Sequence, residues 1–185
     1  MTSSLAIAAA PQADAPQTGL DVAPVDGKSF RSGMARLAAG VNIITSAGAD
    51  GWCGFTASAV CSVTDDPPTL LVCVNRGSQS YEVIKAGGVL CVNTVSGPHE
   101  ELSMRFAGAN GTKDMNARFA GADWTTLVTG APSLSDANVS FDCRVVHSVE
   151  VGTHDALFCE VVAVREGPSA EGLVYYGRKF HRVTV

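Results

Sequence analysis

The 185-residue sequence lacks the motifs of several common enzyme classes. It has no G-x-G-x-x-G, no G-x-x-x-x-G-K-[ST] and no G-x-S-x-G, which excludes a Rossmann fingerprint, a P-loop and a nucleophile elbow. Its four histidines do not have metal-ligand spacing, so no bound metal ion is expected. No basic run exceeds the pair Arg178-Lys179 and the net charge is −5, so a nucleic-acid partner is not expected either.

Long apolar runs and paired cysteines are also missing. No stretch has the ~20 apolar residues that cross a bilayer, so no membrane association is expected. The six cysteines include no Cys-x-x-Cys pair, which argues against a zinc ribbon and a redox dithiol. Four of them stand in apolar runs and are predicted to be buried thiols, as suits a reducing cytoplasm: Cys73, Cys91, Cys143 and Cys159.

The composition predicts one folded domain behind a short tail. Residues 1–27 are interpreted as a mobile N-terminal tail, because the apolar run Leu5–Ala10 has no basic residue before it, unlike a secretory signal. Residues 28–185 are expected to form a single domain. The hydrophobic content of 46% and charged content of 17% are typical of a globular chain.

The hydrophobic pattern favours strands. A helix is expected over 29–39, capped by Ser29 and ended by Gly40, and short helices over 80–86, 100–107 and 115–119. Strands are expected over 41–46, 55–64, 69–75, 89–95, 139–151, 156–165 and 173–183. The connections are mostly too short for helices between strands, so a mostly β, antiparallel barrel with Greek-key connections is predicted. Core positions are expected at Met34, Leu37, Trp124 and Phe141.

The most distinctive stretch runs from Gly54 to Pro68. It has the pattern of a strand, yet it carries small and hydroxylated residues such as Thr56, Ala57 and Ser58 and ends at a double proline. Small side chains let a bulky ligand approach the backbone, and hydroxyls can donate or accept hydrogen bonds. The alternative is a strand whose polar face meets solvent.

Six blocks resemble the flavin reductase family and follow that family's order. They are residues 34–45, 55–68, 71–78, 91–94, 151–155 and 176–181, and the resemblance as a whole covers residues 30–183. The resemblance implies a dimeric split barrel. It also implies an NAD(P)H:flavin oxidoreductase that reduces FMN or FAD with NADH or NADPH and passes reduced flavin to a separate monooxygenase. The alternative is a non-catalytic flavin- or heme-binding split barrel.

A narrower likeness lies within the family. The runs 128–130, 139–144 and 152–158 are similar to the FMN reductases of the pyrimidine-utilisation pathway, and the reductases of 4-hydroxyphenylacetate hydroxylases are nearly as similar. The family more often has aspartate between the glycine and histidine of its hairpin, where this chain has Thr153.

The resemblance also assigns site residues. It implies that the flavin is bound by Thr45, Phe55, Thr56, Ala57, Ser58, Ser62, Val63, Thr64 and Asn93, with its phosphate at Asn75, Arg76 and Ser78. It places Gly152 and His154 at the nicotinamide cofactor and lets Arg178 and His181 reach the flavin of a second subunit. No catalytic acid or base is expected, because the two cofactors carry the chemistry. The alternatives are an ordinary loop at 75–78, a structural hydrogen bond at Asn93, a turn residue at His154 and a solvated strand end at 178–181.

Overall fold

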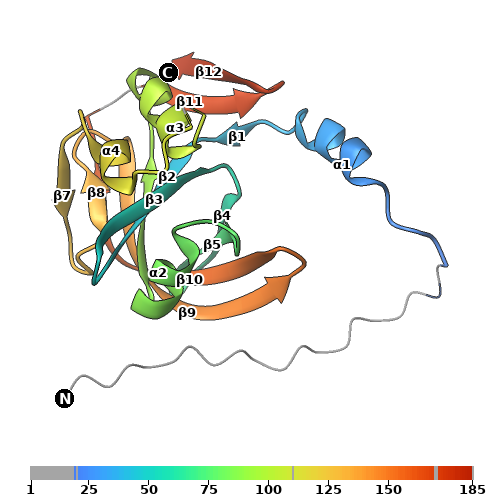
Figure 1. Cartoon of the computed structure of the whole chain (residues 1–185), viewed down its shortest axis with the longest axis horizontal. Coiled ribbons are helices and arrows are strands. Elements are labelled where there is room, and N and C mark those ends of the chain that lie inside the picture. Colours follow the sequence, from blue (N-terminus) through green and yellow to red (C-terminus); the bar gives the residue numbers. More distant parts are fainter. Residues whose placement is uncertain (1–18, 20, 110, 169–170, 185) are drawn as a thin grey trace.

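The computed structural model describes residues 19, 21–109, 111–168 and 171–184 (Figure 1). Most of the expected tail, residues 1–18 and 20, lies outside the described residues. None of the helices in the described ranges is long and apolar enough to cross a membrane.

The largest sheet is antiparallel, with the strand order β3-β2-β6-β9-β10-β5-β4. Its strands are β2 (Asn42–Gly48), β3 (Gly51–Ala57), β4 (Val60–Asp65), β5 (Pro68–Asn75), β6 (Val89–Thr94), β9 (Val139–Val151) and β10 (His154–Glu166). A second sheet joins β1 (Ala39–Gly40), β11 (Glu171–Tyr176) and β12 (Lys179–Thr184), and a third pairs β7 (Trp124–Thr126) with β8 (Pro132–Leu134). The helices are α1 (Gly27–Met34), α2 (Tyr81–Gly87), η1 (Gly97–His99), α3 (Glu100–Phe106) and α4 (Met115–Phe119).

The connection between β3 and β4 shows that the large sheet is curled. These strands are the two edges of the sheet, yet only Ser58 and Ala59 separate them in the chain. Two residues can join opposite edges only if the sheet closes on itself, as in a barrel. Strands β5 and β6 follow each other in sequence but are separated in the sheet by β9 and β10, which is a Greek-key connection. The expected antiparallel barrel is confirmed.

Strand β2 divides the hydrophobic core into two clusters. Ile44 packs inside the barrel with Val72 and Leu90, whereas Ile43 faces α3 and α4 and packs with Phe106. A Cβ at position 54 would lie 2.8 Å from the Ile44 carbonyl oxygen and 2.8 Å from the Phe106 ring. Glycine at this position therefore lets α3 pack directly on β3.

The first helix differs from the expectation in its limits and surroundings. It begins at Gly27, because the Asp26 carboxylate caps it by accepting hydrogen bonds from the amides of Lys28 (2.8 Å) and Ser29 (3.0 Å), and it ends at Met34. The predicted core positions Met34 and Leu37 are wrong, since these side chains are 46% and 60% exposed. Trp124 and Phe141 do pack against the core, as expected.

Two stretches predicted as single strands are each two strands. The stretch 55–64 is interrupted at Ser58-Ala59, and the stretch 173–183 is the β11–β12 hairpin. The hairpin turn places Gly177 at φ 59° and Arg178 at φ 64°. A two-residue turn with positive φ at both positions usually has glycine, asparagine or aspartate at each of them. Here only Gly177 is such a residue, and an arginine rarely adopts positive φ, so the sequence predicts this turn only weakly.

Candidate functional site

Two cavities of about 630 Å³ each meet at Ser58, where the chain passes from β3 to β4. The cavity between α1 and strands β4 and β5 is called here the α1 cavity. The cavity between β3, α3 and the β11–β12 turn is called the α3 cavity. Ser58, Tyr175 and Arg178 line both of them. Each has a volume typical of cavities that bind cofactors.

The walls of both cavities are mostly apolar, with a few cationic groups. The α1 cavity is lined by side chains such as Phe30 and Leu71, and its charged residues are Arg31 and Arg178. The α3 cavity also has Arg178, and in addition Lys179 and Glu100. Apolar walls beside guanidinium groups suit a planar aromatic ligand with an anionic tail. This donor set fits FMN.

The small residues predicted to bind the flavin do lie at these cavities. Thr56 and Ala57 line the α3 cavity, and the Thr56 hydroxyl donates a hydrogen bond to the Ser103 carbonyl oxygen at 2.6 Å. Ser62 lines a third space of about 510 Å³ that also borders Ser58. The structure therefore brings Thr56, Ala57, Ser58 and Ser62 together around the β3–β4 junction.

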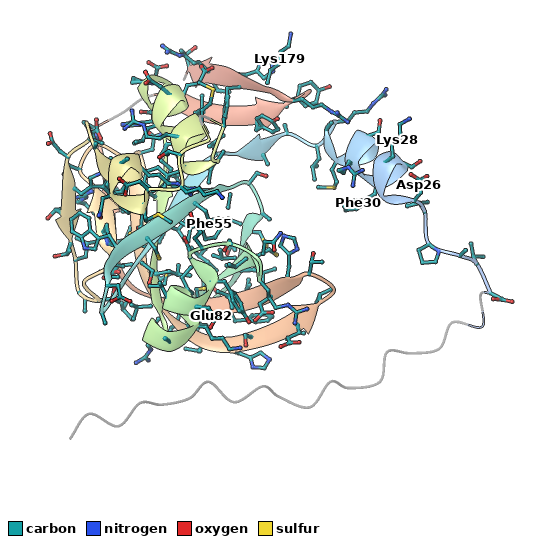
Figure 2. The ribbon with its side chains drawn as sticks, viewed as in Figure 1. Asp26, Lys28, Phe30, Phe55, Glu82 and Lys179 are labelled. Carbon is teal, nitrogen blue, oxygen red and sulfur yellow. The ribbon has the colours of Figure 1, made fainter. Side chains whose placement is uncertain are left out.

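The other predicted residues on these strands lie elsewhere. Phe55 packs against the core of the barrel (Figure 2). Val63 and Thr64 stand on the exposed part of edge strand β4, where the Thr64 hydroxyl accepts a hydrogen bond from the Asp66 amide at 3.2 Å.

Arg178 and His181 belong to the β11–β12 hairpin but differ in position. Arg178 sits in the turn at positive φ and lines both cavities. A non-glycine residue held in this conformation is a feature that recurs at ligand sites. His181 is exposed on β12, with its Nε2 atom 3.0 Å from the Tyr176 carbonyl oxygen. The hairpin thus presents Arg178, not His181, to the cavities.

Thr45 and Asn93 are completely buried in a hydrogen-bond network. The Asn93 amide group donates to the Ile43 carbonyl oxygen at 3.0 Å and to the Thr45 hydroxyl at 3.1 Å. Its oxygen accepts from the Leu134 amide at 2.8 Å and from the Ser140 hydroxyl at 2.9 Å. This network satisfies both ends of the side chain, so the structural alternative accounts for Asn93.

The predicted phosphate loop forms a tight turn after β5. The Asn75 side-chain oxygen accepts from the Gly77 amide at 2.8 Å, and the Asn75 carbonyl oxygen accepts from the Ser78 amide at 3.0 Å. The Ser78 hydroxyl oxygen is buried and has no hydrogen-bond partner among the described residues. A buried hydroxyl without a partner is costly, which singles out this atom. Ser78 is, however, not among the residues that line the α1 cavity, the α3 cavity or the third space.

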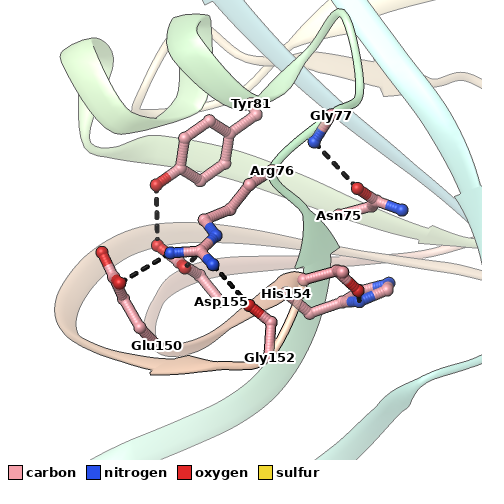
Figure 3. Close-up of polar contacts among 9 residues, drawn as sticks. Asn75, Arg76, Gly77, Tyr81, Glu150, Gly152, His154 and Asp155 are labelled. Atoms are coloured by element: carbon pink, nitrogen blue, oxygen red, sulfur yellow. Dashed lines mark hydrogen bonds and ion pairs between the residues drawn. The ribbon is translucent and has the colours of Figure 1, made fainter.

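Arg76, in the same turn, points toward the β9–β10 hairpin (Figure 3). Its guanidinium group forms an ion pair with Glu150 at 2.6 Å, donates to the Gly152 carbonyl oxygen, and lies 3.9 Å from the Asp155 carboxylate. The structure therefore does not bring Arg76 together with an open cavity, contrary to what the phosphate-loop interpretation implies.

His154 lies at the tip of the same hairpin. The turn has Gly152 at φ 57°, and His154 is exposed and pairs in register with Asn75 of β5. The Thr153 hydroxyl is 2.9 Å from the Nδ1 atom of His154. Thr153 therefore fixes the orientation of the ring, in place of the acidic residue that the family more often has.

The cysteines are free thiols in the structure. Burial raises the pKa of Cys91 to about 12 and that of Cys159 to about 12, and it raises the pKa of Cys143 further. These three thiols stay protonated at neutral pH and are packed as apolar groups, as predicted. Cys73 is only partly buried. In the described ranges, no group of three His, Cys, Asp or Glu side chains could hold a metal ion.

Tyr175 and Arg31 are among the cavity residues that the sequence did not predict. Tyr175 lines both cavities, and the signal for it was the Gly177-Arg178 turn, which would have placed residues 175 and 178 at one end of a hairpin. Arg31 was missed because the helix was expected to pack into the core, whereas Arg31 lines the α1 cavity from an exposed helix.

Comparisons with known proteins identify the family of this chain. Residues 34–184 match the family model of the flavin reductase like domain. The FMN reductase (NADH) RutF of Stutzerimonas stutzeri is 55% identical over 159 residues, covering 86% of this chain and 90% of that protein. A crystal structure of a proposed flavin reductase from Haemophilus somnus is 45% identical, with a TM-score of 0.82, and covers 86% of this chain and 100% of that chain.

A second solved structure, nitrilotriacetate monooxygenase component B from Mycobacterium thermoresistibile, is 28% identical with a TM-score of 0.77. The match covers 84% of this chain and 86% of that chain. The sequence blocks, the curled sheet and these comparisons all lead to the same assignment. The chain belongs to the flavin reductase family, whose members share the split-barrel fold.

Proposed function

We propose that this protein is an NADH-dependent FMN reductase that supplies reduced flavin to a separate monooxygenase. The observation that carries the proposal is the pair of adjoining cavities that share Ser58, Tyr175 and Arg178. Hydride transfer requires two ring systems held in contact, so two ligands need neighbouring spaces with a common wall. The FMN reductases (NADH) that match over most of this chain support the choice of cofactors.

The residues around the β3–β4 junction are proposed to bind the flavin. Bound FMN supplies the redox chemistry, with NADH as the hydride donor, so the protein aligns the two ligands rather than acting as an acid or base. Thr56, Ala57, Ser58 and Ser62 present small side chains and backbone amides where a flat ring can approach. Backbone N–H groups there stabilise negative charge on the reduced ring. The unpartnered Ser78 hydroxyl is assigned to the phosphate.

His154 is proposed to contact the nicotinamide cofactor. It is exposed at the hairpin tip beside Asn75, so its imidazole can stack on or hydrogen-bond an incoming ligand. Arg178 stands between the two cavities, where its charge can pair with an anionic group of either ligand. Thr45 and Asn93 are assigned to the support of the barrel, because their polar atoms are bonded within it.

We propose a homodimer on the basis of α1. Within Gly27–Met34 no side chain is buried, although Phe30 is large and apolar and is 58% exposed. Figure 2 shows Phe30 on this helix, which stands apart from the barrel. Leu37, just beyond the helix, is 60% exposed. A second copy covering this apolar face would complete the α1 cavity and exclude water from it.

The cysteines support a proposed location, and the sequence resemblance supports a proposed partner. Free, buried thiols are compatible with a reducing cytoplasm, where we place the protein. The sequence resemblance to the FMN reductases of pyrimidine utilisation favours a partner oxygenase in that pathway.

Steady-state oxidation of NADH and NADPH with added FMN and FAD tests the proposal. We expect the pairing of NADH with FMN to have the highest kcat/KM. A non-catalytic flavin- or heme-binding module would instead hold its ligand tightly and oxidise neither nicotinamide in any of the four pairings, which would refute the proposed activity.

A further inference from the structure

We propose that Arg76 is a positioning residue that holds the β9–β10 hairpin in place and thereby places His154, rather than a ligand of the flavin phosphate. The inference rests on the proposed contact between His154 and the nicotinamide cofactor for its functional consequence. The positional claim itself depends only on the contacts between the turn after β5 and the hairpin tip.

Every nitrogen of the Arg76 guanidinium group is directed at the hairpin (Figure 3). Nη1 is 2.6 Å from a Glu150 carboxylate oxygen, Nη2 donates to the Gly152 carbonyl oxygen, and Nε is 3.9 Å from Asp155. The Arg76 amide also donates to the Thr153 carbonyl oxygen at 3.0 Å. The planar guanidinium group contacts three residues of the tip and the main-chain amide contacts a fourth, so one arginine fixes the turn relative to β5.

Asp155 gives Arg76 a buried acidic partner in the hairpin. Its side chain is buried, and one carboxylate oxygen accepts a hydrogen bond from the Tyr81 hydroxyl at 2.9 Å. The other oxygen is buried without a hydrogen-bond partner among the described residues, and this is the oxygen that Arg76 approaches. A buried carboxylate needs a neighbouring positive charge, and Arg76 supplies one, with the Lys85 ammonium near the Tyr81 ring as a second cation.

The charge balance argues against a phosphate at Arg76. The Arg76 guanidinium faces two carboxylates, those of Glu150 and Asp155, and even with the nearby Lys85 ammonium the cluster has no positive charge left over. A phosphate placed there would be repelled by the two acidic groups. The Ser78 hydroxyl, which lies beyond this cluster in the same turn, remains the better phosphate ligand.

The position of His154 depends on the Arg76 contacts, because His154 is the last paired residue of β10 at the hairpin tip. It forms the last β10 pair with Asn75 and also the last pair with Val151, beyond which only the turn remains. Its ring is oriented by Thr153, whose carbonyl oxygen accepts from the Arg76 amide. An alanine at position 76 keeps this main-chain bond but loses the guanidinium contacts to Glu150, Gly152 and Asp155. Without these side-chain contacts the tip should move and carry His154 away from its place beside Asn75.

The activity test is a double-mutant cycle in the full-length protein. We compare Arg76→Ala, His154→Ala and the double variant by their kcat/KM for NADH and their Kd for FMN. Arg76→Ala is expected to lower kcat/KM for NADH by about five-fold or more while the Kd for FMN stays within about two-fold, and the double variant should lose no more than His154→Ala alone. A tenfold weaker FMN affinity in Arg76→Ala, or losses that multiply in the double variant, would overturn the inference.

A direct readout of His154 keeps the inference separate from the proposed function. The imidazole NMR signals of His154, recorded without ligands, should shift or broaden in Arg76→Ala. They should stay unchanged in Arg144→Ala, which breaks an exposed ion pair of 2.8 Å with Glu160 on the same two strands. If the signals are unchanged in Arg76→Ala, Arg76 does not position His154. If they shift but His154→Ala oxidises NADH normally, the positioning is supported and the proposed role of His154 is wrong.

A conservative variant covers the case in which Arg76→Ala does not fold. Arg76→Lys keeps the charge beside Asp155 but loses the planar fork that reaches Glu150 and Gly152. We expect it to fold, to retain FMN affinity and to show an intermediate loss in kcat/KM for NADH. Wild-type values of both kcat/KM and the His154 signals in this variant would contradict the inference.

Discussion

Replacing Asn93 with alanine should destabilise the barrel without weakening flavin binding in the molecules that remain folded. The side chain is 0% exposed and makes four hydrogen bonds of 2.8–3.1 Å, to Ile43, Thr45, Leu134 and Ser140. Alanine removes all four and leaves the Leu134 amide and the Ser140 hydroxyl buried without their partner.

The expected magnitude follows from these contacts. At about 1 kcal/mol for each lost hydrogen bond, with a further term for the small cavity, the free energy of unfolding should fall by about 3–5 kcal/mol. In a domain of this size, each 1 kcal/mol lowers Tm by roughly 2–4 °C, so Tm should drop by roughly 6–20 °C. Differential scanning calorimetry and FMN titration well below the Tm of the variant measure the two quantities separately.

The matched control is Asn116→Ala. Asn116 lies exposed on α4, so its loss should change the free energy of unfolding by no more than about 0.5 kcal/mol. The reasoning is refuted if Asn93→Ala keeps the wild-type Tm and instead loses FMN affinity, because the amide would then belong to the flavin site.

Three further outcomes are expected. Ser78→Asp should weaken FMN binding at least tenfold in a fluorescence titration, because a carboxylate at the unpartnered hydroxyl repels the phosphate, and unchanged affinity would place the phosphate elsewhere. Leu37→Glu should convert the dimer to a monomer in light scattering, since it puts a charge on the exposed apolar face, whereas a wild-type monomer would remove the premise. In the folded protein at pH 8, iodoacetamide should not modify Cys91, whose pKa burial raises to about 12, whereas the same thiol should be modified after unfolding in urea; modification of Cys91 in the folded protein would contradict the packing.

The sequence predicted those elements whose residue pattern matches the place that they take in the folded protein. The β9–β10 hairpin was expected because two β-branched runs flank Gly152, and the structure has strands on either side of that glycine. The cap is Asp26 rather than the expected Ser29, because the Asp26 carboxylate accepts from the amides of Lys28 and Ser29 and also from the Ser29 hydroxyl at 2.7 Å. Such choices depend on geometry that residue type does not encode.

Other features could not be read from the chain, for reasons that are physical. Periodicity predicted an apolar helical face at Phe30, Met34 and Leu37, but it cannot tell a face that packs on the protein's own core from one that stays exposed, as these side chains do. Likewise, the positive charge of Arg76 was evident, yet its partners Glu150 and Asp155 lie more than seventy positions away along the chain. The small residues around Ser58 do border the two cavities, because small side chains beside a strand end leave space wherever the strand lies; their contact with flavin stays a prediction.

The central claim is that this protein transfers hydride from NADH to FMN and then releases the reduced flavin. The most direct measurement is anaerobic stopped-flow mixing of a small amount of protein with excess FMN and NADH, followed by the loss of oxidised-flavin absorbance. The account predicts that the protein reduces many equivalents of FMN, at a rate that saturates with NADH. Reduction that stops at one equivalent per chain, or no reduction above the rate without protein, would contradict it.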